Sequence, residues 1–431
     1  MDLPGAGGGG NPLEQLLGDL LHLMGGANPG GGAVELARTL AQGAATDGQP
    51  EGNVDPSTRM EFEALAAVAE MHATELTGLS VTPTGAPVEI RTVGPGAWAW
   101  QTVEDWRYLF DVAPGRTRSK PESGATGAAG SPPSGGGGGA GGGAVPVEGL
   151  GLMDLAPEDL GGEVVPGAGA ADLVGRWMAT MGPMMTGLQL GSAIGHLARS
   201  TIGQYELPLP RPSTASLLVV PATIDGFARD WSLPVDEVRL WVCLRDVTVN
   251  AVLGRPHVAE RIRVLLTEVM GAAAGDTDAL ADRLGGLDFS DPESLQRLMG
   301  DPGAFFDADA DPDPQRLRVS EDLAVVSATL LGYVEHVLDR AGARLLGGRT
   351  ALTEAWRRRE AAREPSDRTA ELLLGLDLGP AQMARGAAFV AGVVARAGEE
   401  GLVPLWSEPQ NLPTPAEIDA PGLWLERISL G

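Results

Sequence analysis

Three residues in one apolar stretch have the spacing of a zinc-binding helix but not its chemistry. In the pattern H-E-x-x-H, two His at positions i and i+4 share one helix face and hold Zn²⁺, and the Glu beside the first His acts as general base. Arg245 and Val249 have the spacing of the two His, and Asp246 has that of the Glu. Arg is a permanent cation without a lone pair for a metal, and Val has no donor atom. These residues therefore indicate a lost metal site only if the flanking sequence supports their alignment with the H-E-x-x-H pattern.

The sequence on both sides contains several short blocks that support this alignment. The blocks are G-x-Q-x-G-x-x-x-G-x-L-A at 187–198, Leu-Pro-Leu at 207–209, a lead-in at 233–239, L-G-x-x-E-x-V-x-D at 331–339, Trp-Arg-Arg-Arg at 356–359 and a tail between two Trp at 406–424. In this order they resemble the zincin-like metallopeptidase family. That family is found mostly in actinobacteria, often carries only a general hydrolase label and is sometimes linked to deazaflavin-coenzyme genes. The resemblance covers roughly residues 171–428.

The resemblance implies a zincin-like helical domain, a zinc ion and hydrolysis of peptide bonds. It also implies that the third zinc ligand is a carboxylate just before Gly332, where this chain has Leu331. Arg245, Val249 and Leu331 would then occupy all three ligand positions, and none of them offers zinc a donor atom. We therefore expect Arg245 and Leu331 to lie close together on two helices that cross at one lost site, with Glu335 near Arg245.

On this interpretation no residue is a confident catalytic group, and no cofactor is expected. Asp246 and Glu335 are the weak candidates for a general base; Asp246 and Arg245 should pair with different neighbours, because adjacent helical residues point about 100° apart. The alternative is a relocated zinc site built from His257, His336 and Glu335. Zinc is expected only under that alternative, which is the less favoured one because Glu335 and His336 are adjacent and cannot share a helix face.

The composition limits the partners and the compartment. The 431 residues carry a formal charge of −26, which argues against binding to nucleic acid or to an anionic membrane surface. Cys243 is the only cysteine, so an internal disulfide is excluded and we expect Cys243 in the core. No apolar run approaches the ~20 residues of a membrane span, and the first ten residues lack the features of a signal peptide. We expect a cytoplasmic protein whose partner is a protein or a peptide.

Apolar residues recur at helical spacing along most of the chain, so we expect a mainly α fold with at most a small β element. Its expected parts are a disordered Gly-rich tail at 1–12, an N-terminal helical region at 13–113, a Gly/Pro/Ser-rich flexible linker or inserted loop at 114–170 and the zincin-like helical domain at 171–431. Helices are expected over 34–44, 56–76 and 233–253, the last capped by Ser232, and strands over 217–220 and 88–92.

Two side-chain clusters are better explained by structure than by ligand binding. Trp98, Trp100 and Trp106 lie within nine positions and should anchor a small core. The run Arg357–Arg359 lies at helical ion-pair distances from acidic neighbours, so it should form a salt-bridged helix face.

Three functions are compatible with these observations. The first is a degenerate zincin that has lost its ligands and binds a partner without catalysis. The second is a hydrolase with a relocated or non-standard site, in which Asp246 or Glu335 is the base. The third is a structural subunit whose cleft is filled by Val249 and Leu331. We favour the first and third, because Arg245 repels a metal ion and water needs a Lewis acid to become a hydroxide near neutral pH.

Overall fold

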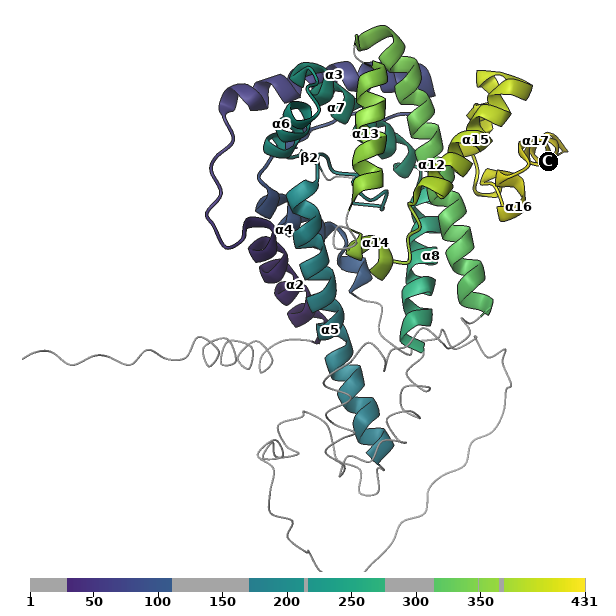
Figure 1. Cartoon of the computed structure of the whole chain (residues 1–431). Helices are drawn as coiled ribbons and strands as arrows, with labels where there is room; N and C mark the ends of the chain where they lie inside the picture. The colour runs from purple at the N-terminus through teal and green to yellow at the C-terminus, as the bar shows by residue number, and fades with distance from the viewer. Residues whose placement is uncertain are drawn as a thin grey trace, which may run out of the picture.

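The computed structural model describes residues 29–110, 170–212, 216–275, 314–347, 349–363 and 368–430. This part of the chain is mainly α-helical with two short strands (Figure 1), so the predicted fold class is confirmed. The expected tail at 1–12 lies outside the described residues, and so does the linker at 114–170 except for its last residue.

The elements follow one another in two runs along the chain. The first run is α2 (Pro29–Thr46), α3 (Pro56–Thr77), β1 (Ile90–Thr92), α4 (Pro95–Asp105), η1 (Arg107–Leu109), α5 (Ala170–Ser200), β2 (Leu217–Val219), α6 (Pro221–Asp230), α7 (Val235–Leu253) and α8 (Pro256–Gly275). The second run is α12 (Pro314–Leu345), α13 (Arg349–Ala362), α14 (Thr369–Leu373), α15 (Pro380–Ala397), η3 (Glu399–Trp406), η4 (Pro409–Asn411), α16 (Pro415–Ile418) and α17 (Pro421–Leu430).

The N-terminal helices α2 and α4 pack against the long helix α5 (Figure 1). Three glycines of α5, each four residues from the next, allow α2 to approach closely: a Cβ added at Gly187, Gly191 or Gly195 would stand 2.6 Å from a carbonyl oxygen of α2. The residues of α2 that face them are Ala33, Ala37 and Ala41. The glycine block in the sequence therefore serves helix packing, because only Gly lets these two backbones touch.

The two strands join the N-terminal part of the chain to the segment that precedes α7. β1 pairs with β2 in parallel, with Ile90 opposite Leu217 and Thr92 opposite Val219. Both strands lie within the ranges that the sequence predicted. β1 also packs on α3, which begins as predicted at a proline whose preceding residue, Asp55, accepts a hydrogen bond from the Ser57 N–H at 2.8 Å.

Helix α7 packs against four other helices, namely α3, α6, α8 and α12. Its buried residues lie on every side, as expected of a helix that is surrounded by others. Its start differs from the prediction. Ser232 does not cap it, since its backbone is in the left-handed region with φ 54°, and Pro234 holds the N-cap position. The residue before a proline is restricted to extended backbone, so the helix begins only at Val235.

The C-terminal helices complete the core from the other side. α12 packs between α8 and α15, and it touches α15 through glycine: a Cβ at Gly386 would clash with the backbone of Ala328, and one at Gly332 with that of Gly386. Buried residues of the N-terminal and C-terminal elements form one hydrophobic cluster. Within the described ranges, no helix is long and apolar enough to cross a membrane.

Candidate functional site

The three motif positions of α7 lie inside the protein. Arg245 has 6% of its surface exposed, and Asp246 and Val249 have none. A site that processes a substrate needs reactive atoms that open to a cleft. Here, burial forces each polar atom to find a partner within the protein, and those partners explain the geometry.

Asp246 is held by the loop between α5 and β2. Its Oδ2 accepts a hydrogen bond from the Gln204 N–H at 2.5 Å, and its Oδ1 accepts one from the Tyr205 N–H at 3.3 Å. The loop can come this close because position 203 is glycine; a Cβ there would clash with the Asp246 carboxylate. Burial raises the pKa of Asp246 to about 6, and the guanidinium of Arg245 and the two N–H groups oppose that rise.

Arg245 does bond to its neighbour, contrary to the prediction. Its Nη1 lies 3.4 Å from Asp246 Oδ1. Its guanidinium also stacks over the indole of Trp356, with 5.1 Å from Cζ to the ring centroid, and the Arg359 guanidinium stacks over the same ring at 4.8 Å. Two cations beside one indole require negative charge nearby.

Glu206 supplies that charge. Its Oε1 accepts a hydrogen bond from Arg359 Nη2 at 2.8 Å, and its side chain is 1% exposed. Burial alone would raise the pKa of Glu206, but the guanidiniums of Arg359, Arg245 and Arg363 outweigh that effect and leave the pKa below its ordinary value. A buried Glu that stays ionised among three Arg residues is the electrostatic centre of this region.

The charge cluster continues through α13 and α14. Arg363 Nη1 pairs with Glu371 Oε1 at 2.5 Å and with Glu360 Oε2 at 3.3 Å. Arg359 also pairs with Glu360 at 2.8 Å and donates to the Ser200 carbonyl at 2.6 Å. The cluster therefore ties α13 to the end of α5 and to α7, and we call it the Glu206 cluster. It consists of Glu206, Arg245, Asp246, Arg359, Glu360, Arg363 and Glu371.

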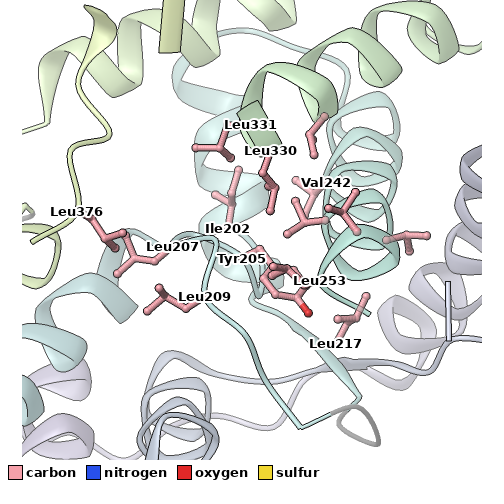
Figure 2. Packing of buried hydrophobic residues seen from close by; sticks show 14 of the residues in the cluster. Ile202, Tyr205, Leu207, Leu209, Leu217, Val242, Leu253, Leu330, Leu331 and Leu376 are labelled. Atoms are coloured by element: carbon pink, nitrogen blue, oxygen red, sulfur yellow. The ribbon is translucent and has the colours of Figure 1, made fainter. Parts of the chain in front are cut away.

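The other two predicted ligand positions belong to the apolar core. Val249 on α7 and Leu331 on α12 are both buried members of the hydrophobic cluster, and α7 packs against α12. Figure 2 shows Leu331 gathered with Ile202 and Val242 in this core. Glu335, which we expected near Arg245, forms an ion pair with Arg357.

The residues of the relocated metal site have separate surroundings. His336 Nε2 lies 3.0 Å from Glu399 Oε2, and Glu335 pairs with Arg357. His257 has its pKa lowered by burial first and by Arg255 second. Among the residues that the structure describes, no three His, Cys, Asp or Glu side chains are grouped as a metal site would require.

Sequence reasoning missed Glu206 and Trp356 as members of this region. Glu206 is the only charged residue between 201 and 210, and an isolated charge in such a run signals a buried partner. The predicted salt-bridged face is present in part, since Arg358 Nε lies 2.6 Å from Glu354 Oε1. However, Arg359 points inward to Glu206, which the local spacing does not reveal.

Two comparisons with known proteins gave a match, one to a family and one to a fold. The model of a family described as zincin-like metallopeptidase matches residues 33–425. A solved structure from Chloroflexus aurantiacus, described as a "putative hydrolase with a novel fold", has a similar fold with a TM-score of 0.56 at 20% sequence identity. The alignment covers 92% of this chain and 98% of that one. No curated protein matches the chain. The family match begins at α2, so it includes the N-terminal helices that the resemblance from residue 171 onward left out.

Proposed function

Because this chain belongs to the zincin-like metallopeptidase family, we propose that it keeps the family's scaffold without zinc chemistry and acts as a catalytically inactive binding or scaffold protein. The observation that carries the proposal is the state of Asp246. The residue in the position of the general base is fully buried, and both its oxygens accept hydrogen bonds from the protein itself. A general base must reach the proton that it removes from a substrate. The carboxylate of Asp246 instead faces the backbone N–H groups of Gln204 and Tyr205.

The donor set supports the same proposal. Catalytic zinc needs three protein ligands and one open position for water. Arg245, Val249 and Leu331 have no atom that coordinates zinc, so the residues at these positions do not fit the metal. The guanidinium of Arg245 is in addition a permanent positive charge at the position of the first ligand.

Arg245 takes over one role that a metal has elsewhere, which is to neutralise buried carboxylates. Its charge lies beside Asp246 and contributes to the low pKa of Glu206. Replacing Arg245 by a neutral His would remove this charge from the surroundings of both carboxylates. The proposal therefore assigns the region a structural purpose, the joining of α7, α13 and the loop before β2.

The partner that we propose is a protein or a peptide. The charge of −26 favours a partner that is not a polyanion, so nucleic acid and anionic membranes are unsuited. We propose a cytoplasmic location for the same protein.

Metal analysis of the purified full-length chain tests the proposal. After dialysis against a weak chelator, we expect far less than one zinc per chain by mass spectrometry and no cleavage of a mixed peptide library. Val249→His alone should also bind no zinc, because one donor does not make a site. The control is the combined variant Arg245→His, Asp246→Glu, Val249→His and Leu331→Glu, which restores the family's donor set. One zinc per wild-type chain would overturn the proposal and favour a hydrolase with a relocated site.

A further inference from the structure

One of the three clustered tryptophans is not part of the core, contrary to the prediction. Trp98 and Trp106 are 0% and 2% exposed, but Trp100 on α4 is 41% exposed. The guanidinium of Arg38 on α2 stacks over its ring, with 5.0 Å from Cζ to the centroid. Such a contact fixes the orientation of an indole at the surface. A large exposed aromatic ring that is held in place is typical of a binding site.

A cavity of about 590 Å³ opens beside this ring. One face of α2, the loop after α2 and Trp100 form its walls, and its volume lies in the range of small-molecule sites. The wall residues that matter below are Thr39, Gln42, Gly43, Gln49, Glu51 and Trp100. None of them belongs to the Glu206 cluster.

The charged side chains at this cavity are already engaged. Arg38 pairs with Glu35 and with Glu104. Glu51 accepts hydrogen bonds from the Gly96 N–H at 2.6 Å and from the Ala97 N–H at 3.2 Å, which holds the first turn of α4. A phosphate or carboxylate would therefore find no uncommitted cation here, and the nearby acidic groups would repel it.

The groups at this cavity that remain able to hydrogen-bond a ligand are uncharged. The side-chain amides of Gln42 and Gln49 make no hydrogen bond to any other residue in the described part of the chain. Each amide offers two N–H donors and one carbonyl acceptor. The hydroxyl of Thr39 donates to the Glu35 carbonyl at 3.0 Å, so it faces a ligand with its lone pairs.

From this combination we infer that the cavity between α2, its following loop and Trp100 binds a neutral carbohydrate. A pyranose ring has an apolar face of C–H groups, which fits the part of the indole that Arg38 leaves exposed, and a rim of hydroxyls, which fits the two amides. Nucleotides and other anions do not fit, because the local charges are paired or acidic. The site is independent of the lost zinc site, so it gives the chain a binding activity that its family does not imply.

The structure offers a pair of matched variants for the test. Gly43 and Gly32 both lie on α2, and a Cβ added at either meets no atom within 4 Å. Only Gly43 lines the cavity. Gly43→Leu should therefore occupy part of the cavity without disturbing the core, and Gly32→Leu is its control for the change in helix propensity. Trp100→Ala removes the platform, and Trp231→Ala is its control, since Trp231 is 36% exposed elsewhere on the surface.

Saturation-transfer NMR on the full-length chain measures binding of cellotriose, maltotriose, xylotriose and tri-N-acetylchitotriose, each at about 10 mM, a concentration that detects weak binding. We expect at least one of these sugars to bind. Gly43→Leu and Trp100→Ala should each weaken it about tenfold or more, and both controls should retain wild-type affinity. The inference is overturned if no sugar binds or if Gly43→Leu binds as well as Gly32→Leu. A neutral tripeptide serves as a further probe. The inference is equally overturned if the tripeptide binds, no sugar does, and Gly43→Leu weakens the binding of the tripeptide.

Discussion

Replacing Glu206 by Gln tests whether the Glu206 cluster holds the fold together. Gln has nearly the same shape, so no cavity arises and the change is electrostatic. Removing one partner of a buried ion pair typically costs about 3–5 kcal/mol, because a charge remains without compensation. Here Arg359 keeps Glu360, Arg363 keeps Glu371 and Arg245 keeps its aspartate. We therefore expect the lower end of that range, a loss of about 3 kcal/mol in the free energy of unfolding at neutral pH.

Urea denaturation, followed by circular dichroism, measures this loss as a fall in midpoint at unchanged slope. The control is Glu354→Gln: Glu354 pairs with Arg358 at 2.6 Å, but both side chains are more than half exposed. That variant should lose no more than about 0.5 kcal/mol. The pKa of Glu206 is lowered in the folded state, so its stabilisation is present above the ordinary pKa of a Glu and is lost as the pH falls further. Equal losses in the two variants, or a penalty that persists in acid, would refute the reasoning.

Three further outcomes follow from the structure. The pKa of Asp246 is raised to about 6, so its ionisation destabilises the fold as the pH rises from about 4 to about 7. Across that window the stability of Asp246→Asn relative to wild type should rise by up to about 3 kcal/mol in pH-dependent melts. A difference in stability that stays constant with pH would contradict this. Gly191→Ala should destabilise the protein by about 1–3 kcal/mol, since its Cβ would meet a carbonyl oxygen of α2. Gly271 has open space around it, so Gly271→Ala should stabilise the protein by a few tenths to about 1 kcal/mol. Chemical denaturation compares the two variants. Tyr205→Phe removes the 2.7 Å hydrogen bond to Asn250 and should cost about 1 kcal/mol by thermal melting, and no loss would mean that the bond contributes nothing.

Local sequence signals were enough to predict several elements of this fold. Asp55 before a proline indicated the start of α3, and the short apolar run that begins at Leu217 indicated β2. Both signals act within a few residues of the structure that they determine. The start of α7 was wrong by two residues, because the restriction that a proline imposes on the residue before it outweighs the capping tendency of Ser232.

The candidate site was harder to predict because its contacts join distant parts of the chain. Glu206 and Arg359 are 153 positions apart, and nothing in the spacing around either residue indicates the other. The same reason explains Trp100: burial of Trp98 and Trp106 depends on what lies against each face of α4 in three dimensions. Residue types showed that Arg245, Val249 and Leu331 offer no donor atom to zinc, but they did not indicate which contacts these three side chains make in the fold.

The glycine contact between α5 and α2 also has a mechanical consequence. Three glycines of α5, spaced by four residues, face three alanines of α2 with the same spacing. The two helices therefore fit together only where each glycine lies opposite an alanine. If α2 slid along α5, the next position in which the backbones fit would lie one repeat away, a displacement of about 6 Å. Any smaller sliding would bring a side chain against backbone. Steric contact therefore opposes gradual sliding of α2 along α5, whereas separation of the two helices meets no such contact.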